Sequence, residues 1–402
     1  MNQTASGRAV PARPVPNTAG EILAAARAIV PELRARAVEI EANRGLPDDV
    51  VELLRGTGVF RMGFPAALGG PELSSVEQIE VIEVLSYGDT SAGWCAMIGM
   101  DAGLYALSEQ AAREMFPSPD VIAAGMLPPV GRADRVPGGY RVSGRWSFAS
   151  GIAHADWVSA GAFVHTDGER ETTESGKPRW RIMMVPPDEV ELIDNWHATG
   201  LAGSGSADYV IKDVFVPESR TFSLGEPTRS GPLSAPDSLM RKMPAVALGA
   251  ARAALDHVRD VARTRVHPMT GQRWADDYRV QFAVGRCEME LQAARHAVHA
   301  SLAQRWDRLL GGGTLDDLTP DERVATTLTR YNAMRGARDV VRRLYDLLAT
   351  ASIYRPSPMD RWLRDLETMC QHVMAQDVVV QSAGAYLLGG KPRFPLALGI
   401  VN

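Results

Sequence analysis

The sequence predicts an α+β fold in which a small β domain stands between two helical regions. Two features of the 402-residue chain carry this prediction. Apolar residues recur at helical spacing in the first and last parts of the chain, and they change to strand-like alternation in the middle. We expect a disordered arm over 1–17, an N-terminal helical domain over 18–127, a β-barrel or sandwich over 128–237 and a C-terminal four-helix bundle over 238–402.

The N-terminal region has clear signals for helices. Thr18 followed by Glu21 is the pattern of a capping box, and apolar residues then follow at helical spacing. The stretch before Thr18 is rich in proline, glycine and small polar residues, which is typical of disorder. Further along, SSVEQIEVIEVLSYGD and TSAGWCAMIGMDAGLYAL predict two more helices. The second is apolar on nearly every side, so we expect it to be buried.

The middle region changes period. GGYRVSGRWSFAS has a glycine turn followed by alternation, and WVSAGAFV, RWRIMMVP and ADYVIKDVFVP are further strand-like runs between Gly, Pro and Asp. The last region returns to long periodic helices, which begin near Leu239. Three long helical runs are followed by a fourth that begins with RDLETMCQH, and together they predict an antiparallel bundle.

Composition excludes several classes of function. The net charge is −5 and the pI is about 6.0, which does not favour nucleic acid or an anionic membrane as a partner. No run of apolar residues is long enough to span a membrane, and the N-terminus lacks the apolar centre of a signal peptide. Three widely separated cysteines form neither a disulfide framework nor a metal site, so we expect a cytoplasmic protein without a metal. The sequence also lacks HEXXH, GXSXG and Walker motifs.

The nonapeptide RDLETMCQH, residues 364–372, contains the first candidate site. On a continuous helix, Asp365, Thr368, Met369 and His372 would share one face. His372 there is either a packed core residue or a chemical group that points into a cavity. Arg364 and Asp365 are expected to form a structural ion pair.

Two loops of the middle region are further candidates. GLAGSGS, residues 200–206, lacks the strand–helix context of a dinucleotide site, so it is either a tight turn or a loop whose backbone N–H groups approach a ligand. RWSFASGIAHADW places small hydroxyl residues beside aromatic ones, which suits the edge of a flat ligand, although an ordinary strand end has the same composition. His154 in this stretch is expected to brace the turn.

Together these stretches resemble the acyl-CoA dehydrogenase superfamily. The resemblance extends from about Leu46 to about Gly390 and is carried by five segments in the family's order. They are LPDDVVELLRGTGVFRMGFPAALGG, GGYRVSGRWSFASGIAHADWV, GLAGSGSADYVIKDVFVP, ALGAARAALDHVRDVARTR and IYRPSPMDRWLRD.

The carboxylate base of the dehydrogenases has no counterpart at either of its usual positions. No glutamate occurs between Met240 and Arg265, no acid follows Val378, and His372 falls close to the position of the family's late base. RDLETMCQH and FASGIAHADW resemble the two-component flavin-dependent monooxygenases of the same fold more than they resemble the dehydrogenases. These monooxygenases include the oxygenase component of p-hydroxyphenylacetate hydroxylase, dibenzothiophene monooxygenase and the sugar nitrososynthases. Alternatives are a flavin dehydrogenase or oxidase with an unusual base, and a non-redox member of the fold that binds a ligand.

The resemblance implies a function and a set of partners. Reduced flavin, FMN or FAD, would come from a separate NAD(P)H-flavin reductase and react with O2 to a C4a-hydroperoxyflavin, which would hydroxylate or N- or S-oxygenate a small organic substrate. It also implies a homotetramer. The catalytic residues it suggests are His372, Ser150 and Asp101. The cofactor-binding residues it suggests are Trp146, Phe148, Ser150, Gly203, Ser204, Ser206 and Arg265, the last as the nearest match to the family's pyrophosphate-binding arginine.

Overall fold

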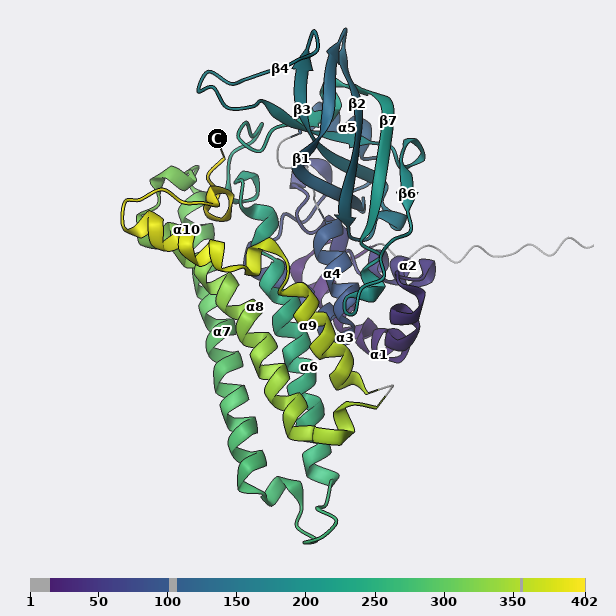
Figure 1. Cartoon of the computed structure of the whole chain (residues 1–402), viewed down its shortest axis with the longest axis vertical. Coiled ribbons are helices and arrows are strands. Elements are labelled where there is room, and N and C mark those ends of the chain that lie inside the picture. The colour runs from purple at the N-terminus through teal and green to yellow at the C-terminus, as the bar shows by residue number, and fades with distance from the viewer. Residues whose placement is uncertain (1–14, 101–106, 355–356, 402) are drawn as a thin grey trace, which may run out of the picture.

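The computed structural model describes residues 15–100, 107–354 and 357–401, and it has the predicted order of helices, sheet and helices (Figure 1). The sheet lies at one end of the molecule, the N-terminal helices lie beside the junction, and the long C-terminal helices extend to the opposite end. The predicted fold class is confirmed. The expectation of a disordered arm falls mostly on residues 1–14, which lie outside the described residues.

The N-terminal helices are α1 (Ala19–Asn43), α2 (Asp48–Gly56), α3 (Ser75–Gly88), α4 (Thr90–Gly99) and α5 (Glu109–Met115). Capping side chains set the starts of all of these except α2, which begins after Pro47. The Thr18 hydroxyl accepts the Glu21 N–H at 3.3 Å, as predicted, but the Glu21 carboxylate accepts the Asn17 N–H at 3.2 Å and does not complete a box. Asp89 caps α4 by accepting the Ala92 N–H at 2.9 Å. As predicted, α4 is buried on nearly every side.

One mixed sheet forms the middle region. Its strands are β1 (Ala123–Val136), β2 (Gly139–Ala149), β3 (Trp157–Thr166), β4 (Glu169–Arg170), β5 (Trp180–Val185), β6 (Glu191–Ile193), β7 (Ala207–Pro217) and β8 (Thr221–Phe222). Their order is β6-β7-β2-β1-β3-β5-β8, with β4 paired to β3. Strands β1 and β3 run parallel and the other neighbours run antiparallel. Strand β1 begins before the boundary that we predicted at residue 128.

The C-terminal helices are α6 (Met243–Thr264), α7 (Tyr278–Leu310), α8 (Pro320–Leu348), α9 (Pro358–Met369) and α10 (Asp377–Leu387). The prediction of an unbroken fourth helix is wrong, because a turn that contains the short 3-10 helix η13 (Val373–Ala375) separates α9 from α10. In this turn the His372 ring accepts the Met374 N–H at 3.2 Å, and the Gln376 side chain donates to Cys370 O at 2.7 Å. The two side chains thus bond the Met374 N–H and Cys370 O, which would pair with other backbone groups if the helix continued.

Helix α4 is the element at which the three regions meet. It contacts β1, α6, α9 and the short 3-10 helix η6 (Ala202–Ser204), which lies in the GLAGSGS loop. Close packing continues between α3 and α6, where a Cβ on Gly249 would lie 2.3 Å from Glu83 O. Side chains from the sheet, from α4 and from the last helices can therefore share one site.

The cysteines form no disulfide bonds in this structure. Cys95, Cys287 and Cys370 are buried and free. Within the described part of the chain, no group of three or more His, Cys, Asp or Glu could hold a metal ion, and no helix is both long and apolar enough to cross a membrane.

Candidate active site

His372 lies in the turn between α9 and α10 and not on a helix. The predicted common helix face of Asp365 and His372 is therefore wrong, since α9 ends at Met369. The ring packs edge-to-face against Trp94 of α4, with centroids 5.9 Å apart and planes at 68°. His372 Nδ1 accepts the Met374 N–H at 3.2 Å. Because Nδ1 uses its lone pair in this bond, the neutral ring carries its proton on Nε2.

Three serine hydroxyls form a buried chain beside Trp94. The Trp94 Nε1–H donates to Ser150 Oγ at 2.9 Å. Ser150 Oγ and Ser206 Oγ are 2.7 Å apart, and Ser206 Oγ and Ser204 Oγ are also 2.7 Å apart. These two contacts use two of the three hydroxyl protons, so one proton is left to donate to a bound molecule. The structure thus brings together serines that the sequence placed in two separate loops.

Backbone contacts hold the two loops and α4 together. The Gly151 N–H donates to Ser204 O at 2.8 Å, and the Cys95 thiol lies 3.5 Å from the same oxygen. A Cβ on Gly203 would lie 2.3 Å from Ile40 Cγ2, so Gly203 allows the loop to pack on α1. The GLAGSGS loop is therefore fixed against two helices, and its serines cannot move far from Ser150.

The two aromatic residues predicted to wall a flavin lie in different surroundings. Trp146 is fully buried inside the sheet domain, where its ring stacks on Tyr209 at 5.3 Å and its Nε1–H donates to Gly161 O at 2.8 Å. A ring enclosed in this way cannot wall an open site, so Trp146 is a core residue. Phe148, two residues along, is 65% exposed, with a left-handed backbone φ of 66° and an edge contact to Trp196. Phe148 is free to cover a flat ligand.

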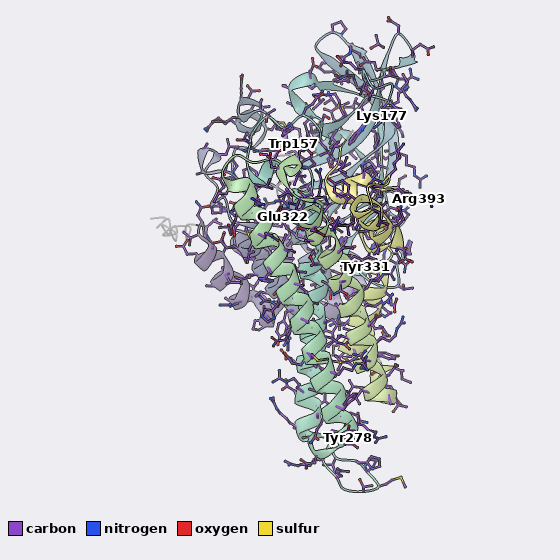
Figure 2. All side chains as sticks on the ribbon, turned by 90° about the vertical axis from the view of Figure 1, so that its left-hand side faces the viewer. Trp157, Lys177, Tyr278, Glu322, Tyr331 and Arg393 are labelled. Carbon is purple, nitrogen blue, oxygen red and sulfur yellow. The ribbon has the colours of Figure 1, made fainter. Side chains whose placement is uncertain are left out.

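Arg265, which was predicted to bind the cofactor, stands apart from this group. Arg265 follows the last residue of α6, and its guanidinium lies 3.9 Å from the Trp274 ring centroid. This is the free end of the bundle, where Tyr278 is labelled, far from the sheet domain (Figure 2). In a single chain, therefore, Arg265 does not join Ser150 and His372. Asp101 lies outside the described residues.

His154 lies in the turn that follows β2, where the sequence predicted that it would brace the chain. It ends the short 3-10 helix after Gly151, and its Nδ1 lies 3.6 Å from Asp48 Oδ1. Burial lowers the pKa of this ring below its usual value.

Arg364 and Asp365 do not form the expected ion pair. Buried Asp365 accepts the Leu201 N–H at 2.7 Å, at the entrance to the GLAGSGS loop. Arg364 instead pairs with Glu41 of α1 at 2.6 Å, with Asp360 at 2.8 Å, and donates to Thr199 O at 2.6 Å. Together the two residues connect α9 to α1 and to the loop that carries the serines.

Two of the residues that organise this site, Trp94 and Asp89, were not predicted from the sequence. Trp94 lies in an almost wholly apolar helix, where a tryptophan looks like ordinary core, yet it contacts both His372 and Ser150. Asp89 looks like a simple helix cap, but it is buried and interacts electrostatically with Asp365. An isolated acid directly before an apolar helical segment is the signal that could have drawn attention to Asp89, whereas no sequence signal marks Trp94.

Burial shifts the titration of the site's ionisable groups. Burial, assisted by the positive charge of Arg330, lowers the pKa of His372 to about 4. Burial and then the nearby Asp89 carboxylate raise the pKa of Asp365 to about 7. Burial also raises the pKa of Asp89. At neutral pH, therefore, His372 is uncharged, and the pKa of Asp365 lies far above that of an exposed carboxyl.

These side chains fit a flavin ring. An isoalloxazine has flat apolar faces and an edge of N–H and C=O groups. The serine chain has a spare hydroxyl proton and His372 has an Nε2–H, while Phe148, two residues before Ser150 in the chain, has an exposed aromatic ring. Each of these groups matches one feature of the cofactor.

Comparison with known proteins places the chain in a family. Residues 18–115 match the acyl-CoA dehydrogenase N-terminal domain, and residues 243–377 match the acyl-CoA dehydrogenase C-terminal domain. The chain belongs to the acyl-CoA dehydrogenase family, as the sequence motifs indicated.

Curated relatives within this family carry the names of monooxygenases. Indole-3-acetate monooxygenase of Pseudomonas putida is 33% identical, with 89% of this chain and 91% of that protein covered. The oxygenase component of FADH2-dependent resorcinol hydroxylase from Rhizobium sp. is 27% identical, with 90% and 92% covered. Among solved structures, XiaF from Streptomyces sp. in complex with FADH2 and glycerol has a TM-score of 0.84 and 25% identity, with 93% of this chain and 96% of that chain covered.

Proposed function

We propose that this protein is the oxygenase component of a two-component flavin-dependent monooxygenase that acts on a small aromatic substrate. The observation that carries the proposal is the group formed by half-buried His372 and by buried Trp94, Ser150 and Ser206, in which a neutral imidazole and a hydroxyl chain meet at one tryptophan. The names of the relatives support the same reaction and the same class of substrate. When bound, reduced flavin supplies the chemistry by activating O2 for transfer of one oxygen atom.

The serine chain and Phe148 would hold the flavin. The spare hydroxyl proton, which Ser150 has when Ser204 donates to Ser206 and Ser206 to Ser150, would donate to the polar edge of the ring. The Trp94 N–H fills a lone pair of Ser150 and strengthens its hydroxyl as a donor. Phe148 would cover the ring and exclude water from it.

His372 would act as a hydrogen-bond donor. Its Nδ1 already accepts the Met374 N–H, so the group free to act is Nε2–H. A proton held on Nε2 can stabilise negative charge that develops on oxygen during transfer. This arrangement favours a donor over a general base, which would need a free lone pair on a ring nitrogen.

A dehydrogenase is the second candidate, and the carboxylates of the described chain do not support it. Glu367, the last acid before His372, pairs with Arg342 and lies 4.0 Å from Arg338. Asp365 is bonded to the backbone of Leu201. A base for removing a proton from carbon must be free to face the substrate.

We further propose a homotetramer and a separate NAD(P)H-flavin reductase as partners. Tyr278 and Phe282 at the free end of the bundle are 76% and 56% exposed, and Leu388 is 89% exposed, so apolar side chains are available for subunit contacts. Arg265 at the same free end would reach a flavin only in a neighbouring subunit. Mass measurement in solution tests the assembly.

The reaction is tested by mixing the protein anaerobically with reduced FMN or FADH2 and then adding O2. We expect the protein to delay the appearance of oxidised flavin and to suppress release of H2O2. Reoxidation as fast as that of free flavin, with either cofactor, would contradict the proposal. A His372→Gln variant should bind flavin normally but give little product from indole-3-acetate or resorcinol as trial substrates, and undiminished product formation would remove His372 from the mechanism.

A further inference from the structure

Arg330 of α8 is a buried cation that lies beneath the turn of His372. Its side chain is 1% exposed, and it donates to Ala397 O at 3.3 Å and contacts Met374 Sδ at 3.7 Å. Its Nε has no hydrogen-bond partner among the described residues. Burial of a guanidinium costs free energy unless a counter-charge compensates its positive charge.

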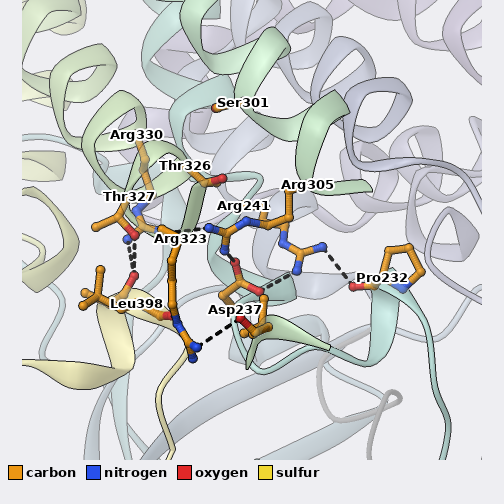
Figure 3. A network of polar contacts seen from close by, with 12 residues as sticks. Pro232, Asp237, Arg241, Ser301, Arg305, Arg323, Thr326, Thr327, Arg330 and Leu398 are labelled. Atoms are coloured by element: carbon orange, nitrogen blue, oxygen red, sulfur yellow. Dashed lines mark hydrogen bonds and ion pairs between the residues drawn. The ribbon is translucent and has the colours of Figure 1, made fainter. Parts of the chain in front are cut away.

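The counter-charge nearest to Arg330 is already shared by two other arginines. Figure 3 shows Arg330 at the edge of a buried cluster in which Asp237 pairs with Arg241 at 2.5 Å and also with Arg305. Burial lowers the pKa of Arg330 to about 10, so the guanidinium stays charged at neutral pH. Arg330 is therefore a surplus positive charge inside the protein.

Met374 connects this charge to the imidazole. Its sulfur contacts Arg330, and its N–H donates to His372 Nδ1 at 3.2 Å. A positively charged His372 would need a proton on Nδ1, which would break the bond to Met374 and place a second cation near Arg330. Both effects oppose protonation of the ring.

The other charged groups around His372 are engaged elsewhere. On α8, Arg335 donates to Ala375 O at 2.8 Å. On α10, Asp377 accepts the Tyr331 hydroxyl at 2.8 Å. On α9, Asp365 bonds to Leu201 and Glu367 pairs with Arg342, while α4 presents the uncharged Trp94.

We propose that Arg330 is a positioning residue that keeps His372 neutral with its proton on Nε2, through the contact with Met374 and through its charge. This inference rests on the proposed donor role of His372. It explains why a guanidinium is buried without a counter-ion of its own. It also predicts that the donor form of His372 persists at acidic pH.

The test measures His372 directly, without flavin or substrate. Solid-state NMR of protein labelled with 15N-histidine reports the protonation of each ring nitrogen, and a His372→Gln variant identifies the signal among the eight histidines. In the wild-type protein we expect a neutral ring with Nε2–H at pH 6 and a midpoint near 4. A ring that is charged, or protonated on Nδ1, at pH 6 overturns the proposal without any variant at Arg330.

Variants separate the charge from simple packing. Arg330→Met should raise the midpoint of His372 by about one pH unit, a tenfold change in proton affinity, whereas Arg330→Lys should restore most of the wild-type value. Arg335→Met is the matched control, because Arg335 contacts the same turn from the same helix. In this variant the midpoint of His372 should stay at the wild-type value. An unchanged midpoint in Arg330→Met, or an equal shift in Arg335→Met, overturns the proposal.

The readout distinguishes this inference from the proposed function. If the midpoint shifts as expected but His372→Gln forms product normally, Arg330 controls the ring and the role of the ring is wrong. If His372→Gln is inactive and the midpoint of Arg330→Met is unchanged, the ring acts as proposed and Arg330 does not control it.

Discussion

Replacement of Asp365 by asparagine should change how stability depends on pH. The Asp365 carboxyl is 3% exposed and accepts the Leu201 N–H at 2.7 Å. Asparagine has the same shape as the protonated acid, and its amide oxygen can accept the same N–H. The substitution therefore removes the titration of the group while it keeps the contact with the loop.

The size of the effect follows from the raised pKa. Burial and the Asp89 carboxylate raise the pKa of Asp365 to about 7 in the folded protein, against about 3.9 in an unfolded chain. A raised pKa means that the folded state holds the proton more tightly, so the stabilisation is complete below about pH 4 and is lost as the pH rises through 7. Between about pH 5 and pH 8 the wild-type protein should lose about 2.5 kcal/mol of unfolding free energy through this group. This loss of unfolding free energy belongs to the Asp365–Asp89 pair and not to Asp365 alone. The Asp365→Asn substitution also removes the negative charge that Asp89 would otherwise face.

Urea unfolding of wild-type and Asp365→Asn protein at pH 5 and at pH 8, followed by tryptophan fluorescence, measures this difference. We expect the two proteins to be within about 1 kcal/mol at pH 5 and the variant to be the more stable at pH 8. Asp360→Asn is the control, since it removes a carboxylate from the same helix at a side chain that is 27% exposed, and it should keep the wild-type dependence on pH. Parallel pH dependence in Asp365→Asn and wild type would refute the reasoning.

Three further outcomes follow from the site. Ser150→Ala leaves the buried Trp94 N–H without its acceptor, so we expect the unfolding free energy to fall by about 1–3 kcal/mol. We also expect weaker flavin binding in a titration, and unchanged affinity would contradict a donor role for the serine chain. Phe148→Ala, at a side chain that is 65% exposed, should change stability by no more than about 0.5 kcal/mol yet weaken flavin binding several-fold, and equal affinity would show that Phe148 does not cover the ring. The pKa of His372 is lowered to about 4, so the yield of product per flavin oxidised should not change between about pH 6 and pH 8 because of His372. A loss of yield with a midpoint near about 6.5 that is absent in His372→Gln would contradict this prediction.

Regular periodicity made the fold predictable from the sequence. The apolar spacing located α6, α7 and α8, and alternation located the strands. The end of α9 was not predictable in this way, because it depends on bonds that His372 and Gln376 make with the backbone of the turn. Sequence patterns describe a helix that continues, and they do not show where side chains compete for its backbone groups.

The site was predictable only in part for a similar reason. Ser150, Ser204 and Ser206 could be named from their loops, but their common hydrogen-bond chain depends on pairing between β2 and β7 and on the position of Trp94. Trp146 and Phe148 are two residues apart and look equivalent in the sequence. The left-handed backbone at Phe148 and the irregular pairing between Trp146 and Ala149 decide that one ring is enclosed and the other exposed.

Because His372 lies in the turn between α9 and α10, the direction in which its ring points does not depend on the geometry of either helix. A ring carried on a continuous helix would rotate by about 100° for each inserted residue, whereas the ring of His372 is aimed by a compact turn anchored to α8 through Ala375. Insertions or deletions further along α10 should therefore be tolerated without changing where Nε2 points. Substrate range within this architecture can diversify through the surrounding walls while the orientation of the donor is preserved.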